Sequence, residues 1–110
     1  MHRTRSRFLV THRTQPGQRD AVRAVWEQHM APAPVAANPG HLSYAYCFDD
    51  TDPDVISAFQ VYRDPQAAND FQHTSTYRAY ETAVTPLLAG APSVVRLTPA
   101  WTKVGAASQP

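Results

Sequence analysis

The sequence predicts an α+β domain of ferredoxin-like type, with four antiparallel strands and helices on one face of the sheet. Short β-type runs and amphipathic runs follow one another in the order strand, helix, strand, strand, helix, strand, which is the split βαβ arrangement. The 110 residues suffice for one such domain. The third predicted strand is apolar on both faces, whereas two helices cover only one face of a four-stranded sheet. We therefore expect a homodimer in which the two sheets pack face to face.

The first half of the domain is predicted to contain a strand, a helix and a connector. Residues 8–13 form a β-type run that ends at the turn signal Gln15-Pro16-Gly17. Apolar side chains then recur at spacings of three and four, as in an amphipathic helix. These side chains belong to Val22, Val25, Trp26 and Met30, and His29 falls on the same stripe. Pro32 and Pro34 are predicted to end the helix, since proline lacks the amide donor, and a proline-rich connector follows.

The middle of the chain predicts a β-hairpin. Its first strand alternates from residue 42 to residue 48, with Leu42, Tyr44, Tyr46 and Phe48 on one face. Residues 49–54 are acidic and turn-rich, and we interpret them as a solvated hairpin loop. A calcium site of the EF-hand type is not indicated, because the central glycine and the closing glutamate are missing. Residues 55–62 complete the hairpin.

The second half is predicted to contain two helical pieces and a strand. Asp64 and Pro65 are an N-cap and first-turn pair that opens a short helix. Thr74 and Ser75 begin a second helical piece with a core-facing stripe. The stripe comprises Tyr77, Tyr80, Val84 and Leu87 or Leu88. Residues 94–104 are predicted to form the last strand.

Composition and charge exclude several kinds of partner. A net charge of +1 gives no support to nucleic-acid binding, and we interpret the basic residues 1–7 as a solvated tail. Cys47 is the single cysteine and has no partner for a disulfide, which favours a reducing, cytoplasmic setting. No apolar run is long enough to span a membrane. The domain is thus expected to cover residues 8–104, with a flexible tail at 105–110.

In this order the motifs resemble those of the antibiotic biosynthesis monooxygenase family, including its quinol monooxygenase-like members, which are dimeric α/β barrels. The matching pieces cover nearly the whole domain. They are the first strand with Gln15-Pro16-Gly17, the turn Asn38-Pro39-Gly40, the strand end Gln60-Val61-Tyr62-Arg63-Asp64, and Phe71 to Tyr80. Two family features differ here. Gln60 and Tyr62 stand where a Glu-x-Trp is usual, and Phe71 and Thr76 occupy the two histidine positions of a His-x-x-Ser-x-His run.

The resemblance implies oxygenation of a phenolic, quinol or polycyclic aromatic substrate by dioxygen, without flavin or metal. Such a reaction needs a base, hydrogen-bond donors for the developing oxyanion, and a dry pocket. The sequence agrees with this expectation: none of its four glycines lies in a nucleotide-binding loop, and its histidines have no metal-ligand spacing. The alternative is a small-ligand-binding or stress-associated barrel protein without catalytic activity.

Candidate site residues are histidines and aromatic side chains. His73 is the first candidate for the catalytic base, because imidazole titrates near neutrality and this residue lies where two helical pieces meet; an exposed capping histidine is the other interpretation. His12 is in phase with the apolar positions of its strand, so it either reaches the pocket or is structural. Aromatic residues are expected to line the pocket, although aromatic residues at such spacing also form cores. They are Tyr44, Tyr46, Tyr62, Phe71 and Tyr77.

Overall fold

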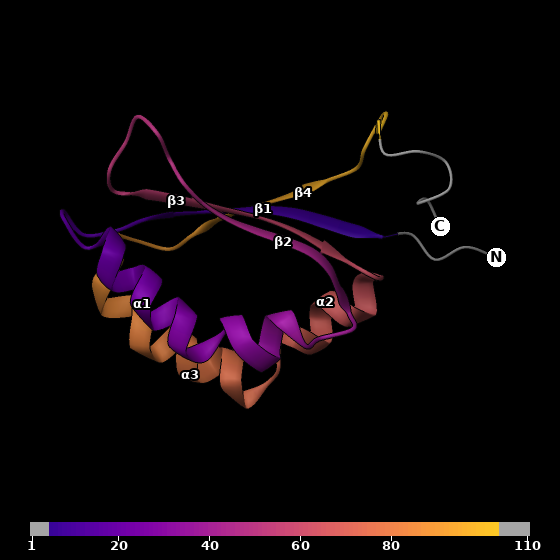
Figure 1. The fold of residues 1–110 in the computed structure, drawn as a ribbon, viewed down its shortest axis with the longest axis horizontal. Coiled ribbons are helices and arrows are strands. Elements are labelled where there is room, and N and C mark those ends of the chain that lie inside the picture. The colour runs from indigo at the N-terminus through magenta and orange to yellow at the C-terminus, as the bar shows by residue number, and fades with distance from the viewer. Residues whose placement is uncertain (1–4, 104–110) are drawn as a thin grey trace.

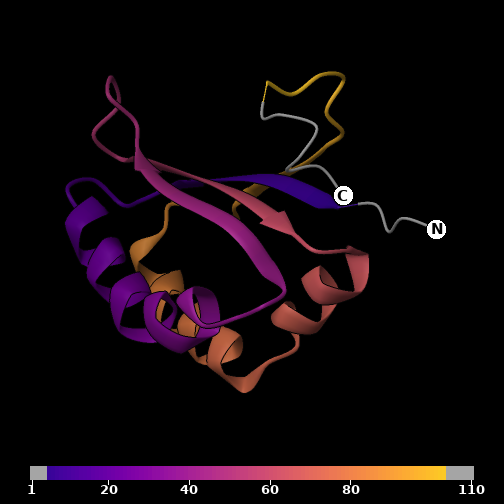
Figure 2. The ribbon, with the colours of Figure 1, turned by 45° about the vertical axis from the view of Figure 1, so that its right-hand side comes forward.

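The computed structural model describes residues 5–103 and confirms the predicted fold class. Its elements are β1 (Ser6–Arg13), α1 (Arg19–His29), β2 (His41–Phe48), β3 (Val55–Tyr62), α2 (Pro65–Gln72), α3 (Ser75–Val84) and β4 (Ser93–Leu97). The strands form one antiparallel sheet in the order β2-β3-β1-β4, and the helices lie together on one face of it (Figure 1; Figure 2). Residues 1–4 of the predicted N-terminal tail, and the C-terminal tail 105–110, lie outside the described residues.

Both predicted starts of the later helices are confirmed by side-chain caps. The Asp64 carboxylate accepts a hydrogen bond of 2.8 Å from the backbone N–H of Ala67, and Pro65 occupies the first turn of α2. The Thr74 hydroxyl accepts a bond of 3.1 Å from the N–H of Tyr77 at the start of α3. Each cap satisfies an amide that has no partner inside the helix.

The connector after α1 is more regular than predicted. Residues Ala31–Ala36 form a short π-helical turn, η1, in which the N–H of Val35 donates to the carbonyl of Met30 over 3.0 Å. A bond across five residues is the π-helical pattern. Pro34 has no amide hydrogen to donate, so the helical path continues through Val35. A short 3₁₀ turn, η2 (Thr85–Leu87), follows α3.

The strand register arranges the helix-facing side chains in rows across the sheet. Directly paired residues point to the same face of a sheet. From one end to the other, the rows on β1, β3 and β2 are Ser6, Tyr62 and His41; Phe8, Gln60 and Tyr44; Val10, Ala58 and Tyr46; and His12, Ile56 and Phe48. Most of the aromatic side chains of the sheet therefore lie under the helices.

Two sequence predictions about the strands are wrong. The register of β2 shifts between His41 and Ser43, so that Leu42 lies in a bulge and is 44% exposed instead of facing the core. The last strand ends at Leu97, not at residue 104, because its partner β1 pairs no further than Arg7. Trp101, which lies beyond the end of β4, is 78% exposed in the protomer.

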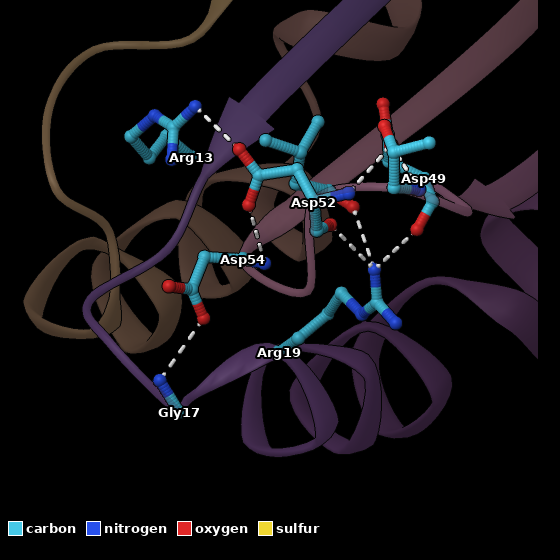
Figure 3. Close-up of polar contacts among 8 residues, drawn as sticks. Arg13, Gly17, Arg19, Asp49, Asp52 and Asp54 are labelled. Atoms are coloured by element: carbon cyan, nitrogen blue, oxygen red, sulfur yellow. Dashed lines mark hydrogen bonds and ion pairs between the residues drawn. The ribbon is translucent and has the colours of Figure 1, made fainter.

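The acidic hairpin loop is fastened to the start of α1 and to β1 (Figure 3). One guanidinium nitrogen of Arg19 donates to the carbonyl oxygens of Asp49 at 2.9 Å, Asp52 at 3.0 Å and Val55 at 3.3 Å. The carboxylate of Asp52 accepts a bond of 2.8 Å from Arg13. These contacts hold the loop against the start of α1 and the end of β1.

Gly17 also binds the acidic hairpin loop. It has a positive φ of 77°, which glycine adopts without the strain that a Cβ would bring. Its N–H donates to a carboxylate oxygen of Asp54 over 3.0 Å (Figure 3). The turn predicted at this position is thus tied to the same hairpin loop.

Within residues 5–103, no helix has the length and apolarity needed to cross a bilayer.

Candidate functional site

A cavity of about 80 Å³ lies between the sheet and the three helices. All five tyrosines of the chain line it. Strands β2 and β3 contribute Tyr44, Tyr46 and Tyr62, and helix α3 contributes Tyr77 and Tyr80. The residues are far apart in the sequence, and the register of the sheet together with the apolar stripe of α3 brings them to one place.

The structure places six of the seven predicted site residues in the cavity wall. They are His12, Tyr44, Tyr46, Tyr62, Phe71 and Tyr77. Gln60, Trp26 and Tyr80 also line the cavity but were not predicted as site residues. Gln60 alternates in phase with Tyr62, and Tyr80 shares the stripe of Tyr77, so the periodicity contained a signal for both.

His73 is the predicted site residue that lies outside this wall. It caps the C-terminus of α2, its side chain is exposed, and its Nδ1 is 2.7 Å from the carbonyl oxygen of Asn69. The expectation that this imidazole faces the pocket is therefore not met. Helix α2 turns its buried side, with Phe71, toward the cavity, and His73 is two positions further along on the solvent side.

His12 is the histidine that lines the cavity. Its Nδ1 is buried and has no hydrogen-bond partner among the described residues. Burial lowers the pKa of the imidazole below its ordinary value, because the charged form is poorly solvated there. The ring is consequently neutral at pH 7, with one nitrogen that can accept a proton.

His41, the first residue of β2, packs against aromatic side chains that line the cavity. Its ring centroid lies 4.3 Å from that of Tyr62, 4.6 Å from that of Phe71 and 5.4 Å from that of Tyr44. Burial lowers its pKa as well. The bulge next to His41 puts it in this position, and neither hydrophobic alternation nor turn chemistry indicated a bulge there.

Two hydrogen bonds fix the polar groups on the other walls. The hydroxyl of Tyr62 donates to the side-chain oxygen of Gln60 over 2.8 Å, and both residues are buried. The indole N–H of Trp26 donates to the hydroxyl of Tyr44 over 3.1 Å, and its ring stacks on Tyr46 with centroids 4.4 Å apart. The Tyr46 hydroxyl itself is buried without a partner. It is therefore a donor without an acceptor among residues 5–103.

The phenol groups of the cavity remain protonated at neutral pH. Burial raises the pKa of Tyr44 to about 12. It also raises the pKa of Tyr46, Tyr62, Tyr77 and Tyr80. No Lys, Arg, Asp or Glu belongs to the cavity wall as the structure describes it. The site thus offers neutral hydrogen-bonding groups and aromatic rings, which suits an uncharged aromatic ligand.

Metal ligation has no visible basis in the described part of the chain. Residues 5–103 contain no cluster of three or more His, Cys, Asp or Glu side chains arranged to hold an ion. Cys47 is exposed and lies on a strand position that points away from the helices. The possible metal donors in the described cavity wall are one imidazole, five phenols, two side-chain amides and the thioether of Met30.

The fold and the cavity define an α+β ferredoxin-like domain with an aromatic site between its sheet and helices. The model of the antibiotic biosynthesis monooxygenase family matches residues 7–83, and the chain belongs to this family. The predicted family is thereby confirmed. No curated protein matches the chain significantly.

Solved structures with the same fold come from several bacteria. A protein of Chloroflexus aurantiacus, provisionally assigned as an antibiotic biosynthesis monooxygenase, is 24% identical, with a TM-score of 0.75 over 90% of this chain and 96% of its own. A protein of Caulobacter crescentus with the same provisional assignment is 24% identical, with a TM-score of 0.79 over 86% and 89%. Rv0793 of Mycobacterium tuberculosis is 23% identical, with a TM-score of 0.78 over 91% and 99%. At these identities the likeness concerns the fold.

Proposed function

We propose that the protein is a monooxygenase that oxidises an uncharged phenolic or hydroquinone-type aromatic molecule in the cavity, using dioxygen and neither flavin nor metal. The observation that carries this proposal is the composition of the cavity wall: one neutral imidazole, His12, among five protonated phenols, with no charged side chain. Family membership supports the reaction class. The aromatic walls support the substrate class, because flat rings stack on them.

The proposed reaction balances without an external reductant. His12 accepts the hydroxyl proton of a phenol, and the resulting electron-rich anion transfers electrons to dioxygen. A C–O bond forms at an unsubstituted ring carbon, and its C–H and the O–O bond break. One oxygen atom becomes a quinone carbonyl, and the other leaves as water with the hydrogens of the former O–H and C–H bonds. The substrate supplies all four electrons.

The cavity residues have separate roles in this proposal. His12 is the catalytic base, and its lowered pKa keeps it unprotonated and ready to accept a proton at pH 7. The hydroxyl of Tyr46, which lacks a partner, is the donor to the substrate oxygen as negative charge develops there. Trp26 and Tyr44 are linked to each other and hold the adjacent wall in place. The small, apolar enclosure limits the access of water to the anion.

Oxygen uptake with a panel of phenols and hydroquinones tests the assignment of the base. His12→Gln is expected to lower kcat by about 10²-fold or more, in the range of general-base contributions. His73→Ala is the matched control, an exposed histidine outside the cavity, and is expected to retain the wild-type rate. A loss of activity in His73→Ala with a fully active His12→Gln would return the role of base to His73, the residue that the sequence suggested first.

The same panel separates catalysis from simple binding. A wild-type protein that binds phenols and consumes no oxygen with any of them would refute the monooxygenase proposal. That result would favour the alternative of a ligand-binding protein without catalytic activity. Binding is followed independently of turnover by the fluorescence of Trp26, which lies in the cavity wall.

We also propose that the protein acts as a homodimer through the face of the sheet opposite the helices (Figure 1). Strand positions on that face carry apolar side chains, among them Leu9, Phe59 and Val61, and exposed Val95 and Leu97. An apolar sheet face of this kind is costly to leave in water. Sedimentation at micromolar concentration is expected to give a dimer, and a stable monomer would contradict this.

A further inference from the structure

Phe71 separates the cavity from a second space, which lies between η1 and the junction of α2 and α3. That space is an open groove of about 450 Å³, formed by η1, the turn after it and the junction between α2 and α3. Pro34, Pro39 and Thr76 are among its lining residues. Of the described residues, Phe71 alone belongs to both walls. Its benzyl side chain is therefore the partition between an enclosed space and an open one.

The partition is held in place from several sides. Phe71 is 4% exposed, and its ring makes edge-to-face contacts with His41 at 4.6 Å and Tyr77 at 5.3 Å between centroids. Tyr62 lies 6.1 Å away on another side. Helix α2 is fixed at its start by the buried Asp64 cap. Any rotation of the Phe71 ring into the groove would break these aromatic contacts, so we treat it as a wall and not as a mobile gate.

The size of the cavity decides what fits behind this wall. An apolar cavity of about 150 Å³ holds one benzene ring, whereas typical ligand pockets measure about 300–1,000 Å³. At about 80 Å³, the cavity is smaller than either of these, so even a single ring fits only when side chains of the cavity wall move. A second fused ring requires the volume that Phe71 fills. The groove beyond it, by contrast, has the size of a ligand pocket.

We propose that Phe71 is a specificity-determining residue that restricts the site to aromatic ligands with a single ring. Shortening its side chain joins the cavity to the groove and admits two- and three-ring ligands. The catalytic consequence rests on the proposed monooxygenase function, whereas the effect on binding does not. The polycyclic substrates that the sequence left open are excluded by this inference for the wild-type protein.

Fluorescence titration tests the inference in the full-length protein. Trp101→Phe serves as the background, since Trp101 is exposed and does not belong to the cavity wall, and Trp26 then reports on binding. The ligands are hydroquinone, 1,4-dihydroxynaphthalene and 1,4-dihydroxyanthracene. In the background protein we expect the single ring to bind at least tenfold more tightly than the two larger molecules. Phe71→Ala is expected to remove or reverse this preference, and Phe71→Leu to give an intermediate change.

Phe8→Ala is the matched control. It removes the same side chain from the cavity wall, at a position that does not border the groove. It is expected to relax the preference for one ring far less than Phe71→Ala does. Equal relaxation by the two variants would overturn the role of Phe71 as the partition, as would a background protein that binds two rings as tightly as one, or that binds no ring. Phe71→Leu carries the test if Phe71→Ala does not fold.

The two proposals fail in different ways. Single-ring binding that depends on Phe71, without oxygen uptake, refutes the monooxygenase function and leaves the ring-size inference intact. Oxygen uptake with two-ring substrates at the rate of single-ring substrates refutes the ring-size inference and leaves the monooxygenase function intact. Where both hold, Phe71→Ala shifts kcat/KM in favour of the two-ring substrate by at least tenfold.

Discussion

Arg19→Ala is expected to destabilise the fold by about 2–3 kcal/mol, far more than is usual for a residue at the surface. The lost guanidinium nitrogen faces three carbonyl oxygens within 3.3 Å, but it carries only two hydrogens, so at most two full bonds are lost. A hydrogen bond from a charged group contributes about 1.5–3 kcal/mol when buried, and partial exposure reduces this to about 1 kcal/mol each. Stacking of the guanidinium on Phe48, 4.1 Å from the ring centroid, adds about 0.5–1 kcal/mol.

The assay is thermal and urea-induced unfolding, followed by circular dichroism. For a domain of this size, the expected loss corresponds to a decrease in Tm of roughly 8–15 °C. Arg13→Ala is the control: this arginine binds the same loop through an exposed ion pair with Asp52, and such pairs contribute about 0–1 kcal/mol. Equal losses for the two variants would refute the reasoning, since the carbonyl contacts of Arg19 would then add nothing beyond a surface charge pair (Figure 3).

Three further predictions concern other parts of the fold. Tyr62→Phe leaves the buried side-chain oxygen of Gln60 without its donor and is expected to cost about 1–3 kcal/mol in urea unfolding; a neutral result would show that the bond is dispensable. Hydrogen bonds from the backbone of the hairpin loop lower the pKa of Asp49, so its contribution to stability is complete above the ordinary value of about 3.9 and is lost as pH falls below it. The stability difference between wild type and Asp49→Asn should therefore shrink below pH 4, and a difference independent of pH would contradict this. Gly40→Ala places a Cβ 3.0 Å from the Cβ of Ala67, which is fixed on α2, and calorimetry is expected to show a loss of about 1–3 kcal/mol, whereas stabilisation would mean that α2 yields.

The fold was predictable because each element has a local signal. Neighbouring residues determine the helix caps at Asp64 and Thr74 and the alternation in β3. Tertiary packing did not override these local signals. The errors arose where a long-range contact decides the outcome. The bulge at Leu42 depends on the register with β3, and the end of β4 depends on where β1 stops pairing. A single sequence shows that a segment favours a β-strand, but it does not show how many residues of a neighbouring strand are available to pair with it.

The site was predictable to the extent that it follows strand and helix periodicity. The tyrosines of β2, β3 and α3 meet because in-phase positions share a face, and this periodicity predicted four of the five tyrosines in the cavity wall. The histidines could not be sorted in this way. His73 follows Phe71 by two residues at the end of α2, and this small change of position turns its side chain from the cavity to the solvent. His41 packs against the aromatic residues only because the bulge at Leu42 shifts the register of β2. Which imidazole reaches the cavity is therefore a property of the packing.

The isolation of His12 has a consequence for the chemistry that the cavity supports. A catalytic histidine is commonly oriented by an acceptor on its second nitrogen, and that acceptor also stabilises the imidazolium. Here Nδ1 is buried with no partner among the described residues, so proton uptake by the ring is not compensated by the protein. Under the proposed mechanism, the compensating charge comes from the ligand itself, as a phenolate formed beside the imidazolium. The proposal therefore predicts a preference for ligands with an acidic hydroxyl next to His12. In the protein without ligand, burial lowers the pKa of His12 and keeps the ring neutral, so the free energy of unfolding is expected to decrease as pH falls below the ordinary histidine pKa of about 6.5.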